Sequence, residues 1–91
     1  MPRYLVERTF PDRLTLPGPQ DDAQARQAFI ENNALDGVTW ILSYVVSGKR
    51  KSFCICDAPT PQAVRLAAQR NGLPVDRISE VLVLDPCFHI P

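Results

Sequence analysis

The chain has 91 residues, of which 45% are hydrophobic and 22% charged, so it can build one hydrophobic core but not two. Ten basic residues balance ten acidic ones, and zero formal net charge disfavours a general nucleic-acid binder or a membrane-surface protein. We therefore expect a single domain spanning residues 1–91, with residues 84–91 as its tail.

The N-terminal part of the sequence predicts a strand, a loop and a helix. Residues 3–9 are rich in β-forming side chains. Three prolines and a glycine between residues 10 and 19 predict a loop, because they break both helix and sheet. Residues 20–36 are good helix formers and end at Gly37. The stripe that this helix should bury comprises Ala25, Ala28, Phe29 and Leu35.

The rest of the chain predicts a β-hairpin, a second helix and a last strand. Residues 38–46 and 52–57 are the hairpin strands, because β-forming residues dominate both and turn residues separate them. A helix is expected at residues 61–71, since Thr60 is a good N-cap and Gly72 a typical stop. Its small buried residues imply a close approach to the sheet; they are Val64, Ala67 and Ala68. Residues 78–84 form the last strand.

The order β-α-β-β-α-β with short connections is typical of the ferredoxin-like plait, an α+β fold. Two helices then cover one face of a four-stranded antiparallel sheet, and the other face stays bare. A bare face with many apolar side chains needs cover, so we expect a homodimer through the open sheet face.

Alternation along each strand assigns side chains to the two faces of the sheet. A two-residue turn at Gly48-Lys49 places Tyr44 opposite Phe53, and Leu42 then lies opposite Ile55. The expected helix-covered face comprises Tyr4, Val6, Trp40, Leu42, Tyr44, Phe53, Ile55, Val81 and Val83. The expected open face comprises Leu5, Glu7, Thr9, Ile41, Ser43, Val45, Ser52, Cys54, Cys56, Ile78, Glu80, Leu82 and Leu84.

The open face so assigned holds candidate metal ligands. Cys54 and Cys56 would place two soft donors side by side, and a nearby Glu7 adds oxygen, a set that suits nickel, zinc or copper. Glu80 is expected beside Glu7. His89, the only histidine of the chain, is a further candidate ligand from the C-terminal tail. The alternative interpretation is that the two thiols are small buried hydrophobes.

Two other function classes follow from the same residues. Glu7 and Glu80 facing each other on adjacent strands would repel, an arrangement that enzymes use to make a general acid or base. An RNA recognition motif keeps stacking aromatics on the strand that corresponds to residues 52–57, where Phe53 is the only aromatic, so RNA binding is disfavoured.

The protein is expected in the cytoplasm. The apolar run from Val38 to Val46 is too short for a membrane span. Glu7 stands where a signal peptide would be apolar. Three cysteines are an odd number, so they cannot form a closed disulfide framework within one chain, and reduced thiols are expected.

Several stretches together resemble one protein family. They are YLVER at residues 4–8, VTWILSYV at residues 38–45, FCICDAPT at residues 53–60, AVR at residues 63–65, NGLPVDRI at residues 71–78 and EV at residues 80–81. The chain is similar here to a family of small bacterial ferredoxin-like proteins described as nickel-binding. The likeness covers nearly the whole chain except residues 11–19 and the segment after Leu84.

The resemblance implies a ferredoxin-like homodimer that binds nickel or another divalent transition metal, with Glu7 and Cys54 at positions typical of the family. Ala67 departs from the pattern, because members often carry a histidine there and imidazole is the commonest transition-metal ligand. Broader relatives with the dimeric α+β barrel include small cofactor-independent enzymes. They imply the alternative function, an enzyme that uses a buried carboxylate.

Overall fold

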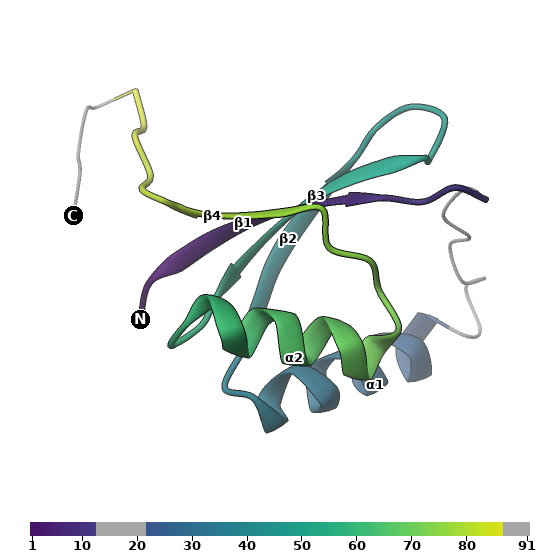
Figure 1. The fold of residues 1–91 in the computed structure, drawn as a ribbon, viewed down its shortest axis with the longest axis horizontal. Helices are drawn as coiled ribbons and strands as arrows, with labels where there is room; N and C mark the ends of the chain where they lie inside the picture. The colour runs from purple at the N-terminus through teal and green to yellow at the C-terminus, as the bar shows by residue number, and fades with distance from the viewer. Residues whose placement is uncertain (13–21, 87–91) are drawn as a thin grey trace.

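The structure is a computed structural model that describes residues 1–12 and 22–86. In chain order its elements are β1 (Arg3–Thr9), α1 (Asp22–Leu35), β2 (Thr39–Val45), β3 (Lys51–Asp57), α2 (Pro61–Asn71) and β4 (Arg77–Val81), as Figure 1 shows. The predicted order of elements is confirmed. Within the described ranges, no helix is long and apolar enough to cross a membrane.

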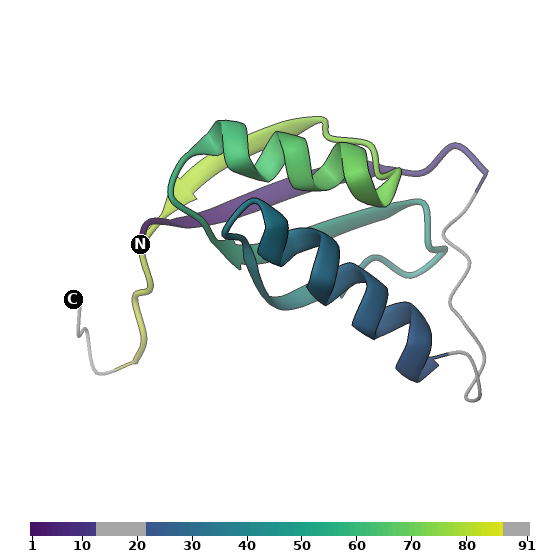
Figure 2. The same ribbon diagram turned by 90° about the horizontal axis from the view of Figure 1, so that it is seen from below.

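The four strands form one antiparallel sheet in the order β2-β3-β1-β4. Both helices lie on the same side of this sheet, and the other side is left open (Figure 2). This is the ferredoxin-like α+β architecture that the sequence predicts.

α2 has strong start and stop signals and buries one side in the core. The backbone N–H of Ala63 donates to Thr60 Oγ1 at 3.1 Å, and Pro61 occupies the first turn, where no N–H is needed. Gly72 ends the helix at a φ of 67°, a left-handed conformation that glycine adopts without strain. The predicted buried stripe is confirmed, since the buried residues of α2 are Ala63, Val64, Ala67 and Ala68.

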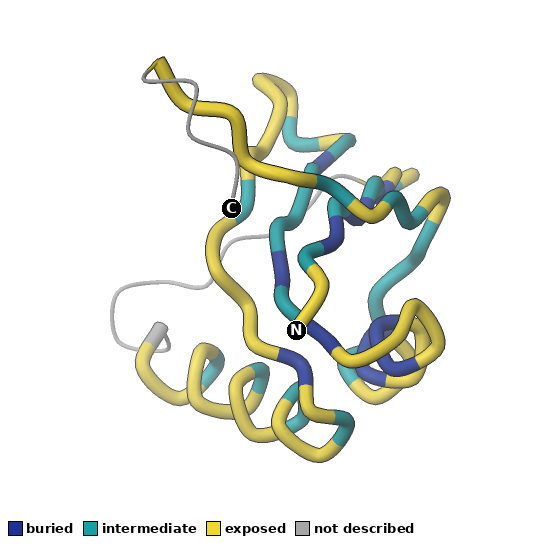
Figure 3. Tube along the Cα trace, turned by 90° about the vertical axis from the view of Figure 1, so that its left-hand side faces the viewer, coloured by how far each residue is buried: buried dark blue, intermediate teal, exposed yellow. Residues whose placement is uncertain are grey.

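α1 is far more exposed than α2, as Figure 3 shows. Of the predicted stripe, Ala25 and Phe29 are half-buried, whereas Ala28 and Leu35 are exposed, so that part of the prediction is wrong. The reason is position, because α1 contacts α2 and the edge strand β2 and does not lie over the centre of the sheet.

Polar side chains join the C-terminal turns of the two helices. Asn32 Nδ2 donates to Asn71 Oδ1 at 2.9 Å, and Asn71 Nδ2 donates to Asn33 Oδ1 at 3.1 Å. Arg70 Nε also donates to Asp36 Oδ2 at 2.8 Å. These contacts fix α1 against α2 without using apolar side chains of α1.

The hairpin of β2 and β3 has the predicted register. Tyr44 lies opposite Phe53 and Leu42 opposite Ile55. The turn is closed by a hydrogen bond from the backbone N–H of Lys49 to the Val46 carbonyl at 2.8 Å. Gly48 and Lys49 both have positive φ, as expected at the centre of a tight hairpin turn.

A β-bulge separates Trp40 from Leu42. Trp40 lies opposite Cys56, while Leu42 lies opposite Ile55, so the two side chains project to different faces. The expectation that they share one face is therefore wrong. The extra residue of the bulge reverses the alternation at this point.

The pairing of β1 with β3 corrects the assignment of faces. Val6 lies opposite Cys54 and Glu7 opposite Phe53. Because opposite residues share a face, Cys54 lies on the helix-covered side with the fully buried Val6, and Phe53 lies on the open side with Glu7. The small side chains of β3, Cys54 and Cys56, thus face the helices, and the larger Phe53 and Ile55 take the other side.

The open face consequently carries large apolar side chains beside charged ones. We define it by the residues of the outward register, Leu5, Glu7, Thr9, Leu42, Tyr44, Lys51, Phe53, Ile55, Asp57, Arg77, Ser79 and Val81 together with Arg3. Tyr44 is 65% exposed. The core on the other side comprises Tyr4, Val6, Val38, Cys56, Ala58, Ala63, Val64 and Ala67.

β4 ends at Val81, earlier than predicted. Val81 lies opposite Arg3, the first residue of β1, so the neighbouring strand offers no further partner. Val83 and Leu84 are exposed instead of paired, and Val83 is not a core residue. Of the expected tail at residues 84–91, the part from residue 87 onward lies outside the described residues.

Candidate functional site

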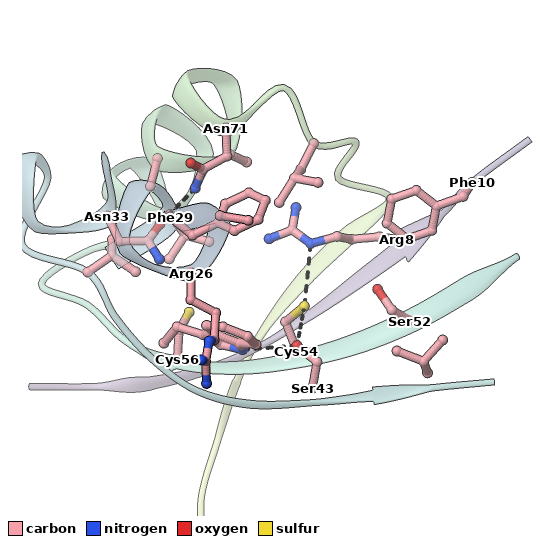
Figure 4. A pocket seen from close by; sticks show the side chains of 18 residues that line it. Arg8, Phe10, Arg26, Phe29, Asn33, Ser43, Ser52, Cys54, Cys56 and Asn71 are labelled. Carbon is pink, nitrogen blue, oxygen red and sulfur yellow. Dashed lines mark hydrogen bonds between the residues drawn. The ribbon is translucent and has the colours of Figure 1, made fainter. Parts of the chain in front are cut away.

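A cavity of about 500 Å³ lies between the sheet and the two helices. We call it the chamber; among the residues that line it are Arg8, Phe29, Ser43, Ser52, Cys54 and Val64 (Figure 4). Its size falls within the range of ligand pockets, which is roughly 300–1,000 Å³. The chamber exists because α1 stands over the sheet edge and presents few apolar side chains to fill the space.

Cys54 lies in the wall of the chamber and accepts two hydrogen bonds. Ser43 Oγ donates to its Sγ at 3.0 Å, and Arg8 Nε donates to the same atom at 3.5 Å (Figure 4). Trp40 Nε1 in turn donates to Ser43 Oγ at 3.0 Å, which orients the hydroxyl toward the sulfur. Three strands thus converge on one sulfur atom.

Arg8 is a buried cation in this wall, with an exposed fraction of 7%. Its Nη1 donates to the backbone carbonyl of Pro74 at 2.7 Å, which ties β1 to the segment before β4. Among the described residues no carboxylate lies within ion-pair distance of Arg8, because the three ion pairs found there join Arg3 to Asp57, Lys51 to Glu7 and Arg70 to Asp36.

Cys56 also lines the chamber but differs in character from Cys54. It is buried, and burial raises the pKa of its thiol to about 11, an effect that the nearby Arg8 charge opposes only in part. At neutral pH Cys56 is therefore a protonated thiol. This matches the alternative interpretation of a small buried hydrophobe for Cys56.

The carboxylates predicted for the site lie elsewhere. Glu7 is on the open face, where Lys51 Nζ is 3.8 Å from its Oε1 and Arg77 is its opposite residue on β4. Glu80 is an exposed residue opposite Tyr4. The expected pairing of Glu7 with Glu80 and their convergence with Cys54 on one face are therefore wrong, because β1 and β3 pair in the other register.

These positions bear on the two chemical predictions. Across residues 1–12 and 22–86, no group of three or more His, Cys, Asp and Glu side chains is placed to hold a metal ion. The described donors of the chamber wall, Cys54 and Cys56 without a carboxylate or an imidazole, do not by themselves complete a nickel site. No carboxylate is among the described residues that line the chamber. His89 and Cys87 lie outside the described residues.

Sequence reasoning missed Arg8, Ser43 and Trp40 as members of this site. Arg8 sits two residues from Val6 in the same strand, so alternation alone places it on the covered face. A charged residue at a strand position that alternation assigns to the covered face was the signal that could have indicated this site. For Trp40 no local signal marks the bulge.

The fold and the chamber define the class of protein, a small ferredoxin-like α+β protein with a cavity between its sheet and its helices. The sequence matches the family described as nickel responsive protein SCO4226-like over residues 4–81, and the chain belongs to this family. The resemblance to small bacterial ferredoxin-like proteins is thereby confirmed.

A solved structure agrees with the fold. The crystal structure of SCO4226 from Streptomyces coelicolor A3(2) is similar with a TM-score of 0.69 and 20% sequence identity, covering 89% of this chain and 96% of that chain. At this identity the likeness shows the fold alone. No curated protein matches the sequence.

Proposed function

We propose that the protein binds a small molecule in the chamber and works as a homodimer that covers its open face. The observation that carries the proposal is the chamber itself, about 500 Å³ of space bounded mainly by apolar side chains with a few polar atoms. Concave, mostly apolar pockets with a few convergent polar groups are the usual form of small-molecule sites.

Packing supports a ligand in this space. Protein interiors are close-packed, and voids larger than a water molecule are few in each domain. Here the wall includes the aromatic ring of Phe29 on α1 and the side chains of Val38 and Val64, which a ligand would contact. An apolar ligand packed against them would bury apolar surface, and each Å² buried stabilises the complex by about 25 cal/mol.

Binding of a neutral apolar fluorophore, N-phenyl-1-naphthylamine, tests the proposal. Trp40 is the only tryptophan of the chain and lines the chamber, so occupancy should change its fluorescence. Ala25→Leu places extra volume in the chamber wall, and Ala28→Leu adds the same volume on the exposed side of α1. We expect at least about a tenfold loss of affinity for Ala25→Leu only. Equal binding by both variants would rule out the chamber as the site.

The homodimer is supported by the composition of the open face. Leu42 and Tyr44 are exposed there, beside half-buried Leu5, Phe53 and Ile55. The charged side chains of this face largely pair with one another, as in Arg3 with Asp57 and Lys51 with Glu7. A face that is apolar and internally neutralised can meet its own copy around a two-fold axis without like-charge repulsion.

Nickel binding is the second candidate function, favoured by the family description, nickel responsive protein. Cys54 would supply one soft donor from the chamber wall and Glu7 an oxygen donor on the open face. These two residues lie on opposite faces of the sheet, so they could not share one ion within one chain. A complete donor set would need groups beyond the described residues or from a second copy.

Nickel titration of the tag-free protein tests this candidate, repeated with Cys54→Ser and with Glu7→Gln. Loss of stoichiometric binding in one variant would assign the site to the corresponding face. Unchanged binding in both variants would remove both residues as ligands, and no binding by the wild type would remove the candidate.

A further inference from the structure

We propose that the ligand of the chamber is a monocarboxylic acid with an apolar body, whose carboxylate binds the guanidinium of Arg8. The inference rests on the proposed function and adds the ligand class. Its basis is a buried positive charge that faces an apolar cavity.

The charge of Arg8 is not balanced by any described acidic residue. Burying an unpaired charge costs several kcal/mol, so buried charges in proteins are paired or bind an ion. Arg8 has an exposed fraction of only 7%. It donates two hydrogen bonds, one to the Pro74 carbonyl and one to Cys54 Sγ, and neither acceptor is a carboxylate. A guanidinium carries five N–H donors, so most of them remain for a ligand. Figure 4 shows the guanidinium of Arg8 pointing into the space between the sheet and the helices.

A buried hydroxyl group lies beside Arg8 in the chamber wall, and apolar side chains line most of the rest. Ser52 lies directly opposite Arg8 on β3 and is buried at 3% exposure, and Cys54 follows it on the same face. Farther along the sheet, Val38 and Cys56 line the wall, and Val64 lines it from α2. A buried cation in a mainly apolar wall fits an amphipathic ligand, with its charged group at Arg8 and Ser52 and its body against apolar side chains such as Val64.

A carboxylate fits this charge better than a phosphate does. A carboxylate is planar, carries one negative charge and matches the fork of a single guanidinium. A phosphate monoester carries about 1.5 to 2 negative charges at neutral pH, more than one arginine balances. Arg26 is the other cation of the wall, and it is exposed, so solvent screens its contribution.

Displacement of N-phenyl-1-naphthylamine from the wild-type protein tests the inference with three ligands of one chain length, octanoate, octanamide and octyl phosphate. We expect octanoate to bind at least about tenfold more tightly than octanamide, a difference of about 1.4 kcal/mol, and more tightly than octyl phosphate. Equal affinities for octanoate and octanamide would overturn the carboxylate proposal while the chamber stands as a binding site. Tighter binding of octyl phosphate would also overturn it. Failure of the fluorophore and all three ligands to bind would overturn the proposed function.

Variants then assign the preference to one arginine. In Arg8→Gln the preference for octanoate over octanamide should vanish while octanamide still binds. The matched control is Arg65→Gln on the exposed side of α2, which should keep the preference. Loss of the preference in Arg26→Gln alone would overturn the role of Arg8. The wild-type comparison of octanoate with octanamide decides the ligand class even where Arg8→Gln does not fold.

Discussion

Arg8 and Cys54 lie against each other in the wall of the chamber, with Arg8 Nε 3.5 Å from Cys54 Sγ, whereas Glu7 faces the opposite side of the sheet. The sequence predicts Glu7 and Cys54 on one face of the sheet, whereas the structure places them on opposite faces. The helix-covered side holds the thiols and the buried cation. The open face holds large apolar side chains and paired surface charges.

The two thiols of β3 should differ in reactivity. Cys54 is half-buried at the chamber wall, while Cys56 is buried and its raised pKa of about 11 keeps it protonated. Because the thiolate is the nucleophile, iodoacetamide should modify Cys54 at least about tenfold faster than Cys56 in the folded protein at pH 8. The measurement uses two single-thiol proteins, Cys54→Ala and Cys56→Ala, each with Cys87→Ser. In denaturant the two thiols should react at similar rates. Similar rates in the folded protein as well would contradict the prediction.

Stability should fall at alkaline pH because of Cys56. Below pH 9.0, the ordinary thiol pKa, folded and unfolded chains both hold the proton, and the stabilisation is fully present. Between pH 9 and about 11 the unfolded chain loses the proton first, so the free energy of unfolding should drop by roughly 1 to 3 kcal/mol. Urea unfolding across this window measures it. In Cys56→Ala the free energy of unfolding should fall less steeply between pH 9 and about 11. An equally steep fall in that variant would contradict the role of Cys56.

Asp57 should contribute to stability at neutral pH and lose this contribution in acid. The hydrogen bond from Arg3 Nε at 2.8 Å lowers the pKa of the Asp57 carboxyl below its ordinary 3.8. A lowered pKa in the folded state stabilises the protein above the unfolded value, and this stabilisation is lost as pH falls through the folded value. The pair is partly exposed, so Asp57→Asn should cost at most about 1 kcal/mol at pH 7.

Urea unfolding at pH 7 and at pH 2 checks this prediction. The cost of Asp57→Asn should shrink toward zero at the lower pH, where the wild-type carboxyl is protonated. Asp12→Asn, at an exposed position, serves as the matched control and should show no such difference. A cost that stays constant with pH would contradict an ionic origin.

The homodimer should depend on the open face. Tyr44→Glu places a charge in the middle of an apolar interface, and two-fold symmetry brings two such charges into it. We expect a shift from dimer to monomer at micromolar concentration in gel filtration with light scattering. Gln62→Glu on exposed α2 adds the same charge away from the face and should stay dimeric. A wild-type protein that is monomeric at micromolar concentration would contradict the dimer.

The order and type of the elements could be predicted from the sequence because their local signals are strong. Thr60, Pro61 and Gly72 mark both ends of α2, and the turn at Gly48-Lys49 fixes the hairpin register. These signals act over a few residues. They do not depend on how the elements are stacked.

The face of β3 could not be settled by hydrophobicity, because both of its sides are apolar. Phe53 and Ile55 are larger than Cys54 and Cys56, and size favours placing them in the core. The deciding constraint is the pairing with β1, which places Cys54 opposite the fully buried Val6 and Phe53 opposite Glu7. This pairing joins segments far apart in the chain, so no local pattern within β3 reveals it.

The most direct test of the account is alkylation of Cys54 in a protein whose other two cysteines are replaced, Cys56→Ala and Cys87→Ser. If Cys54 faces the chamber, saturating N-phenyl-1-naphthylamine should slow its reaction with N-ethylmaleimide about tenfold or more, while Tyr44→Glu leaves the rate unchanged. No protection by the fluorophore, together with faster alkylation in Tyr44→Glu, would place Cys54 on the dimer face and contradict the account.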